Sequence, residues 1–390
     1  MKIIKLSIIL FFTLVFFILI IVYGGRRLGR TYLDFHSAVK IKIESIFIAL
    51  PFDNSIKQAH FEYLRLTNRG HYNEVTLLND GRFMLDTLNY SLFLHERADA
   101  IADLSDFSKH YGAQFIYVRI PSKLKDNSYL PLAFSDNYII EGSNELMNLV
   151  NEFGVDIYDL RAEMEKDGVD FTTAFFRGDH HWTYETALWA FGKISGHLNT
   201  GYGFSVDEMT WDPRQFEHIT YKNGFLGEES ITINNLNNHE DITILVPKFN
   251  TDFVITDLKG YNYMAYLDSG RFADVFIPFV NDESINTIVF GDSNRWFFGY
   301  TRYENTAANE NKNILLISDS MGIPLATYFA NAFTRVDNIY MLSNTNHRVW
   351  DGIANYDYDL VIFAVSDVVT AGESTQDRTL DRFFLGYPPG

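Results

Sequence analysis

The 390-residue sequence contains no cysteine, which excludes disulfide bonds, catalysis by a thiolate and a zinc site with cysteine ligands. This absence suits an exported protein of an organism that does not rely on disulfides. Basic residues are also scarce, with 32 Lys and Arg against 50 Asp and Glu and a formal net charge of −18. Because a body this acidic repels phosphate groups, we expect no nucleic-acid partner.

Long hydrophobic runs are absent after the first 30 residues, where Leu6 to Tyr23 is interrupted only by Ser7 and Thr13. A membrane-spanning helix needs roughly 20 apolar residues, and no clear signal-peptidase site follows this run. We expect residues 1–30 to be a retained membrane anchor that spans the bilayer through residues 6–23. A cleaved signal peptide is the alternative. The basic residues on both sides give no clear orientation, and other features below favour an extracytoplasmic body.

Strand and helix patterns alternate along most of the remaining chain. Residues 31–75 form an expected helical lead-in, and residues 76–390 form the main domain. Apolar spacing predicts a helix from Leu94 to Phe107, and short apolar runs predict strands such as Gln114–Ile120 and Leu360–Val365. This alternation predicts an α/β fold with a parallel sheet and helices on both faces. Between about residues 203 and 303 the helical period is lost, which predicts a β-rich insertion.

A first chemical motif runs from Ile314 to Gly322, where an apolar strand ends in Asp319-Ser320 and a helix begins at once. A serine placed there lies at the mouth of a parallel sheet, where α/β folds build their sites. The first N–H groups of the helix, including that of Met321, can stabilise an oxyanion. The alternative is that Ser320 only caps the helix.

A second motif is Arg177-Gly-Asp-His-His-Trp-Thr183, just before an expected helix capped by Thr183. Serine needs a base to act as a nucleophile, and a histidine oriented by a carboxylate is the usual one. Asp179 and His181 can face one side of an extended segment, and the carboxylate should raise the pKa of that imidazole. They could instead only cap the helix.

A metal site made of Asp179, His180 and His181 is a further alternative. Adjacent residues of an extended segment point to opposite faces, so His180 should face away from Ser320. We therefore expect no metal and no cofactor.

Together the motifs resemble those of the DHHW family of bacterial exported proteins, which is similar to the SGNH-hydrolase-like polysaccharide O-acetyltransferases of alginate acetylation. The resemblance covers the chain from about residue 80 and includes the softer motifs Pro121–Lys123 and Pro247–Phe249. It implies an SGNH-hydrolase-like (flavodoxin-like) sheet, with Ser320 as nucleophile, His181 as base and Asp179 as the residue orienting it. Two departures are Ser318, where many such enzymes have Gly, and Met321, where an aromatic is usual.

Two further residues compete for these roles. Gly291-Asp292-Ser293 also spells Gly-Asp-Ser, but a poor helix start follows it, so we expect a turn. The resemblance places a Gly/Asn loop near the nucleophile here, which makes Asn294, with Met321, an oxyanion candidate. His347 is an alternative base, although a surface-loop histidine is its more ordinary role.

The leading functional hypothesis is O-acetyl transfer to a cell-surface or secreted polysaccharide through an acetyl-Ser320 intermediate. The resemblance implies a membrane-bound O-acyltransferase as the acetyl donor. One alternative is a carbohydrate acetyl-esterase that uses the same residues with water. Another is a non-catalytic polysaccharide-binding or assembly protein, against which the intact Asp, His and Ser argue.

Overall fold

The computed structural model describes residues 71–72, 75–85, 93–131, 138–233, 235, 238–260, 263–277, 288, 290–294, 297, 299–341 and 346–371. The expected anchor and nearly all of the expected lead-in lie outside these residues. Within the described ranges, no helix combines the length and the apolar character needed to cross a membrane. The described residues fall in one unit, residues 63–390.

An eight-stranded sheet forms the centre of this unit, in the order β5-β4-β13-β11-β12-β10-β8-β9. Its parallel strands are β4 (Gln114–Ile120), β5 (Ile157–Asp159), β11 (Glu310–Ser318), β12 (Phe333–Tyr340) and β13 (Leu360–Ser366). Three antiparallel strands extend it: β8 (Phe253–Gly260), β9 (Tyr263–Gly270) and β10 (Tyr300–Asn305). The sheet is therefore mixed: five strands form the expected parallel part, and the three antiparallel strands come from the region expected to be a β-rich insertion. A short connection such as that between β8 and β9 can join only antiparallel strands.

The parallel strands have a permuted order. If counting starts at β11 and continues through β12, β13, β4 and β5, their spatial order is 2-1-3-4-5. This is the flavodoxin-like order, in which ligands bind at the carboxyl ends of the strands where the winding reverses. Here that point lies between β11 and β13, so the end of β11 is the expected place for a site.

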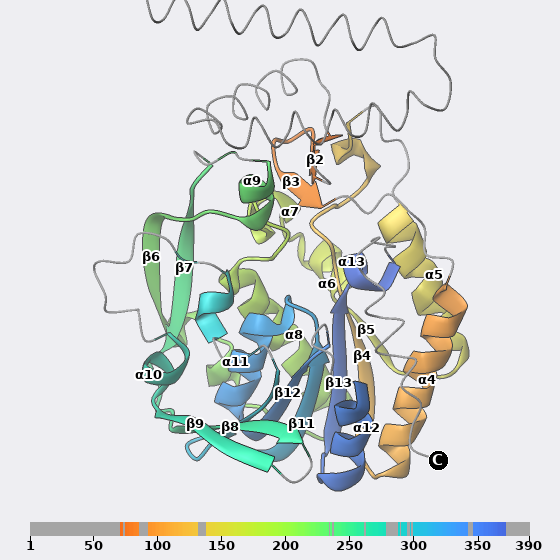
Figure 1. Ribbon diagram of the computed structural model, residues 1–390, viewed down its shortest axis with the longest axis vertical. Coiled ribbons are helices and arrows are strands. Elements are labelled where there is room, and N and C mark those ends of the chain that lie inside the picture. The colour runs from red at the N-terminus through yellow and green to blue at the C-terminus, as the bar shows by residue number, and fades with distance from the viewer. Residues whose placement is uncertain are drawn as a thin grey trace, which may run out of the picture. The chain divides into compact units, whose positions relative to one another are not determined.

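Alternate strand residues supply two separate cores. Ile314 and Leu316 of β11 lie in one core, and Leu315 and Ile317 lie in the other. The first core is shared with α8 (Tyr184–Gly201) and α11 (Gly322–Ala332). The second is shared with α4 (Leu94–His110), α5 (Tyr138–Glu152) and α12 (Asn346–Asn355). Figure 1 shows α4 and α5 together, away from α8 and α11. The mixed α/β architecture with helices on both faces is thus confirmed.

The region expected to be a β-rich insertion also forms a separate antiparallel pair, β6 (Phe216–Phe225) and β7 (Glu240–Pro247). The short helix α9 (Glu228–Thr232) lies between these strands in sequence, and α10 (Phe272–Phe276) follows β9. Later in the same region, Ile288 makes one bridge to Phe225, and Phe290 begins the 3-10 helix η5 (Phe290–Asn294).

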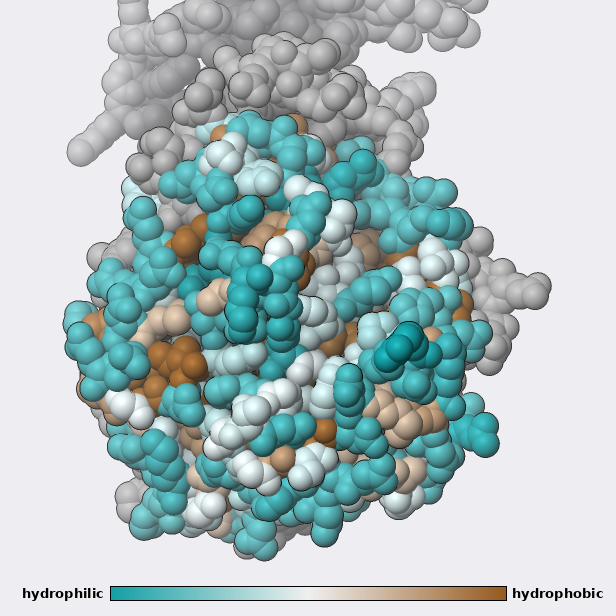
Figure 2. Space-filling view, turned by 180° about the vertical axis from the view of Figure 1, so that it is seen from behind, coloured by the Kyte–Doolittle hydropathy of each residue, from teal (hydrophilic) through white to brown (hydrophobic). Residues whose placement is uncertain are grey.

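A small three-stranded sheet precedes the main fold: β1 (His71–Tyr72), β2 (Val75–Leu77) and β3 (Phe83–Leu85). Other short elements are α6 (Leu160–Asp167), α7 (Phe171–Ala174), α13 (Asp367–Ala371), η2 (Asn127–Tyr129), η3 (Glu208–Thr210) and η4 (Pro213–Gln215). The face shown in Figure 2 is mainly hydrophilic, with small separate hydrophobic patches, as expected for so acidic a chain.

Candidate active site

The segment that carries Ser320 crosses the carboxyl edge of the sheet between β11 and α11. Asp319 is buried, and its carboxylate accepts the N–H of Met321 at 3.0 Å and the N–H of Ser366, the last residue of β13, at 2.8 Å. Asp319 therefore clamps the ends of two neighbouring strands. Gly322 allows the helix to start this close, because a Cβ there would lie 1.9 Å from Ser318 Oγ.

The loop that carries Asp179 and His181 joins α7 to α8. Its ends are held by an antiparallel bridge between Phe175 and Trp182. Thr183 caps α8 by accepting the N–H of Thr186, which confirms the predicted cap. The indole N–H of Trp182 donates to the carbonyl of Met321 at 3.1 Å. This bond joins the loop directly to the segment that carries Ser320.

The structure brings the three predicted catalytic residues together. His181 Nε2 lies 2.8 Å from Ser320 Oγ, and His181 Nδ1 lies 2.5 Å from Asp179 Oδ1. Asp179 and His181 are buried, whereas Ser320 is partly exposed. The arrangement has a reachable hydroxyl, a base in hydrogen-bond contact with it and a carboxylate behind the base. These are the relations that nucleophilic catalysis by serine requires.

Lys123 supports the loop from the end of β4. Its buried ammonium donates to the carbonyls of Phe176, Arg177 and Asp179 at 2.9, 3.3 and 2.7 Å. Burial lowers the pKa of Lys123 to about 8. Sequence analysis noted this lysine only as part of the Pro121–Lys123 motif, and its role as a backbone support could not be derived from that pattern.

The β6–β7 region supports the loop from the other side. The Glu240 carboxylate accepts the N–H groups of Arg177 and Gly178 at 2.7 and 2.6 Å. The N–H of Glu228, in the first turn of α9, donates to Asp179 Oδ2 at 2.9 Å. Neither glutamate could be predicted from the sequence, because the irregular insertion has no periodic pattern that would mark it.

His180 and His181 do not point to opposite faces, and the expectation of an extended segment is wrong. The ring centroid of His180 lies 3.9 Å from that of His181, since the loop bends here and is not extended. Ligand atoms of Asp179, His180 and His181 lie within 4.8 Å of one another, so opposite faces do not argue against a metal. In this arrangement, however, His181 Nδ1 is paired with Asp179 and His180 Nδ1 with Glu229. The absence of a metal stays a prediction.

Burial and neighbouring charges shift the pKa values of the two histidines in opposite directions. Burial and the neighbouring His180 lower the pKa of His181 to about 4, against the attraction of Asp179. Burial also acts to lower the pKa of His180, but the Glu229 carboxylate outweighs it and raises the pKa to about 9. Despite burial, His181 holds the pKa of Asp179 well below its usual range. The expected upward effect of Asp179 on the pKa of His181 is present, but burial and His180 outweigh it, so the imidazole is neutral at pH 7.

Both predicted oxyanion donors, Met321 and Asn294, make hydrogen bonds to other groups of the protein. The N–H of Met321 donates to Asp319 Oδ1, and the buried amide of Asn294 donates to the hydroxyl of Tyr303 at 3.2 Å. Within the described part of the chain, the N–H of Ser320 itself has no acceptor. We add this N–H to the candidates, and the roles of Met321 and Asn294 stay predictions.

The two competing residues lie in other settings. Ser293 falls within η5, so no strand-to-helix turn forms around it. The first residue of η5, Phe290, stacks on the His181 ring with centroids 4.0 Å apart. His347 lies in α12 and not in a loop, and α12 packs on the face of the sheet opposite to α8 and α11.

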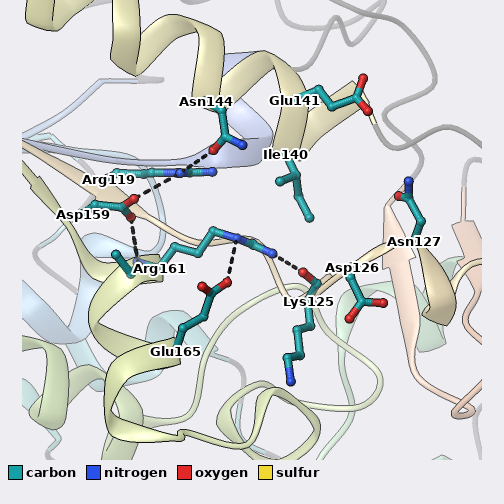
Figure 3. A pocket seen from close by; sticks show the side chains of 11 residues that line it. Arg119, Lys125, Asp126, Asn127, Ile140, Glu141, Asn144, Asp159, Arg161 and Glu165 are labelled. Carbon is teal, nitrogen blue, oxygen red and sulfur yellow. Dashed lines mark hydrogen bonds and ion pairs between the residues drawn. The ribbon is translucent and has the colours of Figure 1, made fainter.

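A polar cavity of about 350 Å³ lies farther along the same edge, beyond β4 and β5. Figure 3 shows Arg119 and Arg161 on one side of it, with Arg119 bonded to Asn144 and Asp159. The Arg161 guanidinium donates to the carbonyls of residues 124 and 125. It thereby braces the backbone that follows Lys123. Since carboxylates compensate both guanidinium groups, the cavity offers little to an anionic ligand.

No family model matches the sequence, and no curated protein matches it significantly. Among solved structures, Bacillus cereus PatB1 with a sulfonyl adduct is similar with a TM-score of 0.63 and 17% identity, over 78% of this chain and 97% of that one. A DHHW family protein from Eubacterium siraeum is similar with a TM-score of 0.55 and 15% identity, over 80% and 96%. The O-acetyltransferase domain of Pseudomonas putida AlgJ reaches only 0.47 at 12% identity, over 80% and 99%, which is too distant to carry an argument.

These similarities show that the chain shares its fold with PatB1 and with a solved DHHW family protein. The resemblance first indicated by Asp179–Thr183 is thereby confirmed at the level of the fold.

Proposed function

We propose that this chain is a serine acyl-transfer enzyme with an SGNH-hydrolase-like domain, in which Ser320 is the nucleophile. The observation that carries the proposal is the continuous contact from Ser320 Oγ through His181 to Asp179, at 2.8 and 2.5 Å. Its place supports the proposal as well, because β11 is the first strand of the permuted flavodoxin-like order and ends at the winding reversal.

The geometry gives each group a role in two half-reactions. In the first, Ser320 Oγ attacks the acyl carbonyl carbon while its proton moves to His181 Nε2, and that proton then leaves with the donor's departing oxygen. In the second, an acceptor hydroxyl gives its proton to Nε2 and attacks the acyl-serine, and Ser320 takes the proton back as it departs. Asp179 accepts a hydrogen bond from Nδ1–H throughout, which keeps Nε2 available and stabilises the transient imidazolium.

In its finer form, the proposal is O-acetyl transfer to a cell-surface or secreted polysaccharide. Support comes from the family resemblance carried by Asp179–Thr183 and Ile314–Gly322. The apolar run over residues 6–23 supports a membrane-anchored, extracytoplasmic enzyme, with a membrane-bound O-acyltransferase as its acetyl donor. Protease added to intact spheroplasts should then digest the body, whereas full protection would contradict this placement.

The nucleophile can be tested with a sulfonyl fluoride, since PatB1 of similar fold has been solved with a sulfonyl adduct. The full-length protein should gain one adduct at Ser320 by peptide mass spectrometry and lose turnover of p-nitrophenyl acetate. Ser320→Ala should remove both the labelling and the turnover, and Ser293→Ala is the matched control that should retain both. Labelling at Ser293, or an active Ser320→Ala, would overturn the assignment.

Transfer and hydrolysis are separated by the fate of the acyl group. With an acetyl ester as donor and a polysaccharide as acceptor, an acetyltransferase yields acetylated polymer in excess of free acetate. Free acetate alone, at a rate independent of the polymer, would favour the esterase instead.

A further inference from the structure

The loop that carries Asp179 and His181 also contains His180, which forms a second histidine–carboxylate pair. The proposed acyl-transfer steps do not use this pair. His180 Nδ1 lies 3.0 Å from Glu229 Oε1, and the Glu229 side chain is completely buried. Within the described residues, the other carboxylate oxygen of Glu229 has no hydrogen-bond partner. A buried carboxylate with so few donors depends on a nearby positive charge, and His180 is the group in contact with it.

The His180–Glu229 pair lies next to His181, the proposed general base. The rings of His180 and His181 are 3.9 Å apart, and His180 Nδ1 is 3.8 Å from Asp179 Oδ1. At such separations, in a site with little water, a fixed charge on one ring strongly affects the charge that the other can hold. The other charged groups that face the two histidines are Asp179 in the same loop, Lys123 after β4, Glu228 in α9 and Asp319 after β11.

We propose that His180 and Glu229 form an ion pair, with a partly buried imidazole and a fully buried carboxylate, that keeps the catalytic imidazole of His181 neutral and able to accept the Ser320 proton. The inference rests on the proposed role of His181 as base. Asp179 by itself would favour a protonated His181, and a protonated base cannot take a proton from serine. The positive charge of His180 opposes that effect, while Glu229 holds His180 charged in a partly buried position. His180 and Glu229 are thus positioning residues that act through His181.

The pKa shifts of the two histidines agree with this division, whereas burial raises the pKa of Glu229 and His180 acts to lower it. The pKa of His180 is raised to about 9 and that of His181 is lowered to about 4. The helix α9 makes both contacts to the loop, because its two adjacent glutamates contact two adjacent loop residues. Glu228 donates its N–H to Asp179, and Glu229 offers its carboxylate to His180.

The test is a pH titration of the full-length protein by NMR with selectively labelled histidine. The chain has 11 histidines, and the His181 resonance is the one lost in His181→Gln. His180→Gln should raise the His181 midpoint by at least two pH units, toward the ordinary value of about 6.5. His180→Lys retains a positive charge and should keep the midpoint low. His197→Gln, which alters a ring stacked on Tyr158, is a remote control and should change nothing.

A second variant tests the pair without altering either ring. Glu229→Gln should lower the His180 midpoint from about 9 to below 6.5 and raise that of His181. Ester turnover follows the same shift: at pH 5.5 His180→Gln should retain about a tenth of its own plateau rate, whereas the wild type should retain nearly all of its rate.

An unshifted His181 midpoint in both variants, or a His180 that is already neutral at pH 7 in the wild type, would overturn the ion-pair proposal. Failure of the proposed function has a different signature. In that case Ser320→Ala would keep its ester turnover, while the titration, which needs no turnover, still reports on the pair.

Discussion

Replacing Asp179 by asparagine removes one charge and one acceptor from a site where three donors converge. Asp179 Oδ1 accepts from the backbone N–H and Nδ1 of His181 at 3.0 and 2.5 Å, and Oδ2 accepts the N–H of Glu228 at 2.9 Å. Asparagine has only one oxygen to offer. Whichever way its amide turns, an NH2 group must face a donor.

The two orientations have different costs. If the oxygen faces His181, the amide NH2 opposes the N–H of Glu228, and this unsatisfied contact should lower the free energy of unfolding by roughly 1–3 kcal/mol. If the oxygen faces Glu228, the NH2 donates to His181 Nδ1 and forces the proton onto Nε2, which can then no longer accept from Ser320. In both cases the imidazolium loses its carboxylate partner. We therefore expect kcat/KM to fall by about 10³–10⁴-fold, or roughly 4–5.5 kcal/mol in activation free energy.

The measurements are kcat/KM for p-nitrophenyl acetate and urea denaturation of the same preparation. Asp170→Asn is a matched control, because Asp170 caps α7 at the surface and lies outside the site. An Asp179→Asn enzyme within tenfold of wild-type activity would refute the argument that this carboxylate orients the base.

Other consequences can be measured in parallel. Lys123→Met should lower the free energy of unfolding by about 3 kcal/mol in urea, because three backbone carbonyls lose one ammonium donor; an unchanged midpoint would contradict the support role. Gly322→Ala should destabilise by roughly 1–3 kcal/mol, and Ser318→Gly should restore stability in the double variant, since Ser318 Oγ and Cβ are the atoms in the way. The raised pKa of His180 predicts stability that is fully present below pH 6.5 and lost as pH rises toward 9, so the wild type should lose more stability over that window than His180→Gln. Activity should survive EDTA; loss with recovery on adding a divalent ion would favour the metal hypothesis for Asp179, His180 and His181.

Local features of the sequence were sufficient to place the elements that carry the chemistry. The strand Gln114–Ile120 and the cap at Thr183 were predicted as they occur, and a helix was predicted directly after Ser320, where α11 begins at Gly322. Such features depend on hydrophobic period and on side chains within a few residues. The Asp179, His181 and Ser320 assignment also came from short motifs, because the chemistry limits which residue types can do it.

Pairings between distant segments could not be derived in this way. The antiparallel extension of the sheet and the permuted strand order depend on contacts between strands far apart in sequence, and no local pattern records their partners. The same is true of Glu228, Glu229 and Glu240, which meet the catalytic loop only because the β6–β7 region folds against it.

Sequence by itself therefore indicated the residues proposed here for acyl transfer and the local elements on which they lie. Only the tertiary structure decided that His180 lies beside His181 and that the pKa of the base falls instead of rising. The physical reason is that burial and charge act through space. The bend in the loop, the carboxylate of Glu229 and the exclusion of water together set the charge of the site. None of them follows from the alternation of side chains along an extended strand.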